Sequence, residues 1–131
     1  MKTLLLVEDD PKISLALGIR LKSSGYAVFT APDAVHAMAQ AVKHNPDAVV
    51  LDINLPGGDG FMVAERLRAR GGDSLLPIVF ITASKKPGLS DRARALRATS
   101  LIEKPFSAAE LIEAIESALS GRDDGVYDFA V

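Results

Sequence analysis

The chain has 131 residues, of which 48% are hydrophobic and 24% are charged. This length and composition fit one compact folded domain and exclude a disordered or fibrous chain. The formal charge of −2 gives no global basic field, so direct binding to nucleic acid or to an anionic membrane is not expected. Without cysteine the chain can form no disulfide, thiolate metal site or cysteine nucleophile. It also has no run of about 18 apolar residues, which excludes a membrane-spanning helix, and no signal-peptide core. We therefore expect a cytoplasmic protein.

Five short apolar runs predict β-strands. Four of them lack the alternation of polar and apolar residues, which is typical of strands covered on both faces of a sheet. The fifth, at 27–30, follows Gly25 and Tyr26. The other four lie at 4–7, 48–51, 78–81 and 101–102.

Amphipathic patterns predict a helix after each strand. The first begins at Pro11 and ends near Gly25, and its inward residues are Ile13, Leu17 and Leu21. Asp33 is expected to cap the second, which stops before Asn45. The expected buried face of this second helix comprises Ala34, Met38, Ala41 and Val42.

The third predicted helix spans 60–70, has Val63 and Leu67 inward, and is followed by Gly71 and Gly72. The fourth is expected to be capped by Ser90 or Asp91 and to reach Arg97. Ser107 and Glu110 predict a capping box for the fifth, whose apolar stripe is Leu111, Ile112, Ile115 and Leu119. Alternating strands and helices predict an α/β fold, with a parallel sheet covered by helices on both faces.

Acidic and hydroxyl residues follow the strands, at the edge where ligands bind in parallel sheets. The first strand ends in Glu8, Asp9 and Asp10, and the third ends in Asp52. Asp10 precedes Pro11 and is expected to cap the first helix. Glu8, Asp9 and Asp52 differ, because like charges about 5 Å apart repel by roughly 3 kcal/mol at an effective dielectric constant of about 20. Such a cluster requires a cation, and ligation by oxygen alone favours Mg²⁺, with Mn²⁺ as an alternative.

A carboxylate beside such a metal can act as a nucleophile toward phosphorus. Asp52 is the candidate nucleophile. Lys104, after the fifth strand, would neutralise the incoming phosphoryl oxygens. The Thr82 hydroxyl and the Ala83 backbone N–H would donate hydrogen bonds to them. Lys104-Pro105 also favours a cis peptide bond.

The order of Glu8-Asp9, Asp52, Thr82-Ala83 and Lys104-Pro105-Phe106 resembles the receiver domain of response regulators, over nearly the whole chain. The loop 52–60 is similar to the one that follows the phosphorylated aspartate in that family. The resemblance implies a flavodoxin-like, doubly wound, five-stranded parallel sheet of order 2-1-3-4-5 with five helices. It also implies a receiver domain at 1–120, with 121–131 as a C-terminal tail or the start of a linker.

By the same resemblance, Asp9 and Asp52 would bind Mg²⁺ through their side chains. The Asn54 carbonyl would join them, and Glu8 would act through water. The chain would then be a phosphorylation-dependent switch of a two-component or phosphorelay system and not an enzyme with an external substrate. Its phosphodonor would be a histidine kinase or a histidine phosphotransfer protein, and its output a protein effector that the sequence does not identify. We expect a monomer or a weak dimer.

Two features depart from the family pattern. Leu101 stands where the family has an aromatic switch residue, and Arg97 where it has glycine. The stretch 85–97 carries five basic residues and one acid, which indicates either a solvated helix face or a docking surface for an acidic partner. His36 and His44 are expected at the surface.

Three other functions compete with the switch. A phosphorylation-independent scaffold would leave Asp52 unmodified. A Mg²⁺-dependent phosphohydrolase would use the same nucleophile but would need a second acid two residues later, where this chain has Asn54. A flavin carrier of similar topology would need a phosphate-binding loop after the first strand, and Glu8, Asp9 and Asp10 would repel the phosphate.

Overall fold

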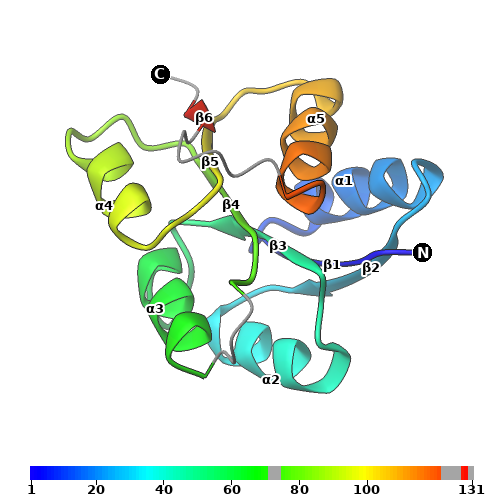
Figure 1. Ribbon diagram of the computed structural model, residues 1–131, viewed down its shortest axis with the longest axis horizontal. Helices are drawn as coiled ribbons and strands as arrows, with labels where there is room; N and C mark the ends of the chain where they lie inside the picture. The colour runs from blue at the N-terminus through cyan, green and yellow to red at the C-terminus, as the bar shows by residue number, and fades with distance from the viewer. Residues whose placement is uncertain (71–74, 122–127, 130–131) are drawn as a thin grey trace.

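The computed structural model describes residues 1–70, 75–121 and 128–129. In this part of the chain, a parallel sheet is covered by helices on both faces (Figure 1). The strands are β1 (Thr3–Val7), β2 (Ala27–Ala31), β3 (Ala48–Asp52), β4 (Ile78–Thr82), β5 (Ser100–Glu103) and β6 (Asp128–Phe129). The helices are α1 (Pro11–Ser23), α2 (Ala34–His44), α3 (Gly60–Arg70), α4 (Leu89–Ala95) and α5 (Ala108–Leu119).

The strand order β2-β1-β3-β4-β5 confirms the predicted order of five parallel strands. A sixth strand, the two-residue β6, extends the sheet beside β5, with Asp128 opposite Ser100 and Phe129 opposite Leu101. Asp128 and Phe129, which lie in the stretch expected to be a tail or linker, therefore pair with the sheet through their backbone. None of the helices in the described ranges is long and apolar enough to cross a membrane.

Alternate residues of each strand face two separate hydrophobic cores, because side chains in a strand point to opposite faces. Leu5, Leu51 and Phe80 pack with α2, α3 and α4. Leu4 and Val50 belong to the second core, which includes residues of α1 and α5. Burial of both faces explains why the predicted strands lack polar alternation.

Three predicted helix caps are present. Asp10 accepts hydrogen bonds from the backbone of Lys12 and Ile13 at the start of α1. Asp33 accepts from the His36 N–H at the start of α2. Ser107 forms the expected capping box with Glu110. These side chains satisfy N–H groups that a helix leaves without intrahelical partners.

The predicted buried face of α2 was wrong at Val42, whose side chain is 63% exposed. The buried residues of this helix are Ala34, Ala37 and Ala41, while Met38 is partly buried. The small alanines face the sheet, so the apolar stripe is rotated away from Val42. Gly71 and Gly72, expected to follow α3, lie outside the described residues.

The predicted start and end of α4 were also wrong. The helix is capped by Gly88, which has a φ of 86°, so Ser90 and Asp91 lie inside its first turn. A positive φ is accessible to glycine at little cost, and this lets the helix begin earlier than a side-chain cap would. At the other end, Arg97 has a φ of 59° and leaves the helix in a left-handed conformation.

Candidate functional site

Glu8 and Asp52 lie side by side at the carboxyl edge of the sheet because of the strand register. Val7 of β1 pairs with Leu51 of β3, so the next residue of each strand reaches the same level. Both residues are nearly buried, with 2% of Glu8 and 3% of Asp52 exposed. Two carboxylates that are both shielded from water in this way require a compensating positive charge.

Lys104 supplies that charge from the end of β5. Its Nζ lies 2.7 Å from Glu8 Oε1 and 2.9 Å from Asp52 Oδ2. The Lys104 backbone N–H donates to the Thr82 carbonyl at 2.7 Å, and the following Lys104-Pro105 peptide is cis, as predicted. One ammonium group therefore bridges acids from β1 and β3. We name Glu8, Asp52 and Lys104 the ion triad.

The protonation of Lys104 reflects two opposing effects. Burial alone would lower its pKa, because it penalises the charged form. The hydrogen bonds and charges of Glu8 and Asp52 outweigh burial and hold the pKa of Lys104 above its usual value. The lysine is thus firmly charged at neutral pH.

Asp9 adds a third carboxylate beside the ion triad. One oxygen each from Glu8, Asp9 and Asp52 lie within 4.8 Å of one another. Asp9 is exposed, whereas the other two are buried, so the cluster opens to solvent on the Asp9 side. Three carboxylates with an open side fit the hard oxygen ligands and retained waters that Mg²⁺ prefers.

The remaining predicted site residues are Asn54, Thr82 and Ala83, and of these Asn54 has a hydrogen bond to Asp52. The Asn54 N–H donates to Asp52 Oδ1 at 3.0 Å. Thr82 is buried, and its hydroxyl oxygen accepts from the Ser84 N–H at 2.9 Å, which leaves the hydroxyl hydrogen able to donate elsewhere. Ala83 is exposed at the start of the next loop. Thr82 ends β4, and Asn54 and Ala83 follow the ends of β3 and β4, so all three lie at the same sheet edge as the ion triad.

Gly60 is a site residue that the sequence reasoning missed. A Cβ at this position would collide with the backbone carbonyl of Asp52, and the Gly60 N–H donates to the Ile53 carbonyl at 2.7 Å. Only glycine allows α3 to begin this close to the end of β3. The sequence contained one indication of this close approach: a glycine at the predicted start of the third helix, where no predicted turn required one.

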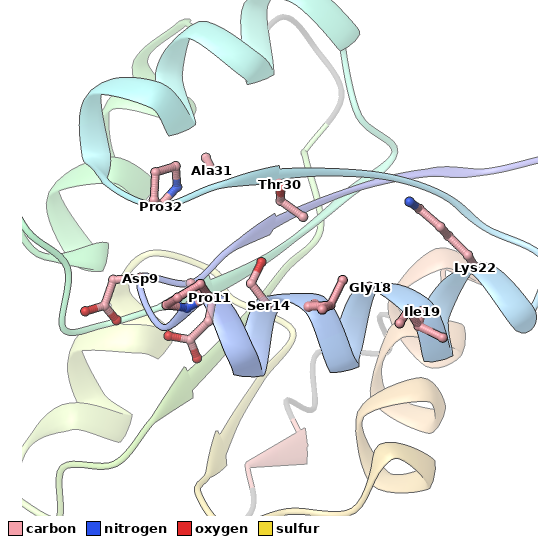
Figure 2. A pocket seen from close by; sticks show the side chains of 11 residues that line it. Asp9, Pro11, Ser14, Gly18, Ile19, Lys22, Thr30, Ala31 and Pro32 are labelled. Carbon is pink, nitrogen blue, oxygen red and sulfur yellow. The ribbon is translucent and has the colours of Figure 1, made fainter.

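A groove of about 420 Å³ runs from the acidic cluster along α1 (Figure 2). Leu15, Gly18 and Ile19 line it on α1, and Pro32 lines it on the opposite side. Leu15 and Ile19 are 67% and 61% exposed, and a Cβ on Gly18 would meet open space. The groove is therefore apolar at Leu15, Gly18 and Ile19 and acidic at the end where Glu8 and Asp9 lie, while Ser14, Lys22 and Thr30 add polar groups to its lining.

Comparison with known proteins identifies related sequences. A family model described as "Response regulator receiver domain" matches residues 4–116. The transcriptional regulatory protein PrrA of Mycobacterium tuberculosis is 37% identical over 120 residues, which cover 90% of this chain and 50% of PrrA. The DNA-binding dual master transcriptional regulator RpaA of Synechocystis is 33% identical over 94% of this chain and 51% of RpaA. The chain thus spans about half the length of these curated relatives.

Solved structures with this fold include two receiver-like proteins. The chemotaxis response regulator CheY4 of Vibrio cholerae has a TM-score of 0.83 and 29% identity, over 91% of this chain and 99% of CheY4. The response regulator TrrA of Thermotoga maritima, solved in complex with Mg²⁺ and BeF, has a TM-score of 0.80. It is 32% identical over 91% of this chain and 100% of its own.

The raised pKa of Lys104 predicts how the ion triad stabilises the fold as pH changes. A raised folded-state pKa contributes stability that is fully present below the unfolded pKa of about 10.4 and is lost as pH rises through the folded value. Urea unfolding should therefore be measured for wild type and Lys104→Met from neutral to alkaline pH. The difference in their free energies of unfolding should shrink as the pH rises above about 10.4. The exposed Lys12→Met is the matched control, and its difference from wild type should stay constant. A Lys104→Met difference that does not change with pH would contradict the ion triad.

Proposed function

The chain belongs to the response regulator receiver domain family, and on this basis we propose that it is a phosphorylation-dependent signalling switch whose phosphate acceptor is Asp52. The ion triad is the observation that carries the proposal: Lys104 Nζ lies 2.9 Å from Asp52 Oδ2 at the carboxyl edge of the sheet. A nucleophilic carboxylate is thereby positioned beside a fixed cation that can bind phosphoryl oxygens.

The proposed reaction is transfer from a phosphohistidine of a partner protein. An Asp52 carboxylate oxygen attacks phosphorus, and the bond from phosphorus to the imidazole nitrogen breaks. The departing ring nitrogen keeps the electron pair of that bond. Lys104 then shifts its contact from the Asp52 carboxylate to the phosphoryl oxygens, while the Thr82 hydroxyl and the Ala83 N–H donate to them.

Asp9, Asp52 and the Asn54 carbonyl are the proposed ligands of Mg²⁺, with Mn²⁺ as an alternative, and Glu8 would act through water. The ion would supply positive charge that offsets the repulsion between the incoming phosphoryl oxygens and the carboxylates. The carboxylate cluster supports this assignment because its oxygens converge within 4.8 Å. Glu8 is expected to contribute least, since its carboxylate already pairs with Lys104.

We further propose that residues 1–120 form the receiver domain and that the phosphodonor is a histidine kinase or a histidine phosphotransfer protein. Phosphorylation would change affinity for a downstream protein partner, and the chain would catalyse only its own phosphorylation and dephosphorylation. The groove beside Asp9 is suited to part of the phosphodonor, because its apolar walls on α1 lead directly to the acidic cluster.

The function is tested by mass spectrometry after incubation with acetyl phosphate and Mg²⁺. Wild type should gain one phosphoryl group, and Asp52→Asn should gain none because the amide is no longer a carboxylate nucleophile. Asp10→Asn is the matched control, since asparagine also caps helices, and it should be labelled like wild type. A full label on Asp52→Asn would refute the assignment. An unlabelled wild type with normal partner binding would favour the phosphorylation-independent scaffold.

The metal assignment is tested in the same assay. EDTA should abolish labelling, and Asp9→Ala should weaken Mg²⁺ binding, measured by calorimetry, from the millimolar range expected of a shallow hydrated site. Glu8→Ala should weaken it less. Equal Mg²⁺ affinity in wild type and Asp9→Ala would remove Asp9 from the ligands.

The groove predicts a substitution that separates docking from chemistry. Ile19→Glu should slow phosphotransfer from a histidine phosphotransfer protein by about tenfold or more, because it places a charge on an apolar contact surface. Labelling by acetyl phosphate should be unchanged, since this small donor does not need the groove. Val42→Glu makes the same change at a residue exposed to a similar degree on α2, and it should leave both reactions intact. Equal slowing by the two variants would exclude the groove.

Leu101 implies a switch without a swinging aromatic ring. Its side chain is 3% exposed and belongs to the core beneath α2, α3 and α4, as expected for a leucine in this place. We infer that the loop after Thr82 moves instead, since it joins the site to α4 and contains Gly88 with its positive φ.

Hydrogen exchange with and without beryllofluoride, a phosphoryl mimic, should therefore change mainly between residues 84 and 97. In Leu101→Ala the fold should lose about 2–5 kcal/mol as a cavity substitution, yet these changes should persist. Ile102→Ala, which faces the opposite core, is the control for lost stability. Loss of the exchange changes in a folded Leu101→Ala alone would make Leu101 itself the switch.

A further inference from the structure

Charge is unevenly divided along the chain. Residues 60–99 contain eight lysines and arginines and three acids, whereas the rest of the chain contains seven and fourteen. The net charge of −2 therefore conceals a basic segment within an acidic protein. This segment includes α3, β4 and α4.

Most of these cations are exposed on the two helices, in the loop before α4 and just after its end. We name this surface the α3–α4 basic face. Its members are Arg66, Arg70, Lys85, Lys86, Arg92 and Arg97. The exposed acids described in the same segment are Glu65 and Asp91, and Asp91 lies 3.9 Å from Arg94. In the described part of this segment, residues 60–70 and 75–99, exposed cations thus outnumber exposed acids.

The two helices are joined by contacts that fix the position of α3 relative to the C-terminal end of α4. Arg68 of α3 donates to the carbonyls of Leu96 at 2.9 Å and Arg97 at 3.2 Å, just beyond the end of α4. The Arg92 guanidinium lies 4.1 Å from the centre of the Phe61 ring of α3. Figure 1 shows α3 and α4 as neighbours on the same face of the sheet. The positions of Arg92 and of the backbone at Arg97 relative to α3 are therefore fixed by the fold.

We propose that the α3–α4 basic face binds an acidic polypeptide segment of a partner protein. Arginine guanidinium groups match carboxylates in bidentate geometry, and a set of charges held in place costs less ordering on binding than mobile ones. A surface that only contacts solvent would be expected to mix positive and negative charges. On the α3–α4 basic face, cations predominate instead.

Two other polyanionic partners fit less well. A nucleic acid strand would extend onto the acidic remainder of the chain, and the two aromatic rings of the described α3, β4 and α4, Phe61 and Phe80, are buried and offer no base-stacking surface. An anionic membrane would favour exposed apolar residues beside the cations. No large exposed hydrophobic residue occurs on α3 or α4, both of which are fully described.

Fluorescence anisotropy with a short labelled poly-L-glutamate peptide tests the proposal on the full chain. Wild type should bind, with affinity that falls as NaCl is raised. The variant Arg66→Glu/Arg70→Glu/Lys86→Glu should bind at least about tenfold more weakly, because it reverses charges across the basic face. The matched control Lys2→Glu/Arg20→Glu/Lys43→Glu changes net charge equally at exposed sites elsewhere, and it should retain affinity within about threefold.

Equal losses in the two triple variants would show that net charge alone is sensed and would overturn the proposal. Tighter binding of oligodeoxythymidylate, or of phosphatidylserine vesicles, that depends on the same three residues would replace it with a nucleic acid or membrane surface. Self-association of wild type that the basic-face variant abolishes, without peptide binding, would also overturn it. Binding is measured in Asp52→Asn as well, so failure of phosphorylation and failure of this surface are distinguished.

Discussion

The ion triad is the constraint on which the organisation of the site depends. Glu8 and Asp52 are buried at the ends of adjacent strands, and their charges would repel without Lys104 between them. The lysine directly follows β5, on the far side of β4 from β3, so the contact requires the sheet to be assembled in its observed order. The site is therefore complete only in the assembled sheet, and the proposed phosphoryl chemistry would use the same cation that pairs with both buried acids.

The three acidic residues that follow β1 have different roles. Glu8 turns inward to Lys104, Asp9 stays exposed beside the cluster, and Asp10 caps α1. The Asp10 N–H also donates to Glu8 Oε2 at 3.2 Å, which fixes the orientation of the buried carboxylate. One short segment thus links the ion triad, the proposed metal site and the start of the helix that lines the groove.

The sequence predicted those parts of the structure that local rules and strand order determine. Unalternating apolar runs located β1, β3 and β4, and the caps at Asp10, Asp33 and Ser107 followed from residue type. Convergence of the acids with Lys104 followed from the carboxyl ends of parallel strands meeting at one edge. The errors at α4 and Val42, and the absence of Arg68, Gly60 and β6 from the expectations, share a cause. Each depends on backbone geometry or on packing partners that periodicity and side-chain capping preferences do not contain: the positive φ of Gly88 at α4, the close approach of Gly60 to the Asp52 carbonyl, and contacts distant in sequence for Arg68 and β6.

The contacts of α4 determine which part of this helix can move when Asp52 is modified. Arg68 holds the backbone beyond its C-terminal end, and Ala93 is buried in the core. Its N-terminal end follows Gly88 and has no side-chain cap, so fewer bonds oppose movement there. The loop from Ala83 to Gly88 joins that end to Thr82 and carries Lys85 and Lys86. A shift of Thr82 toward a phosphoryl group would therefore reposition the cations nearest the site while those at the far end of α4 stay anchored to α3.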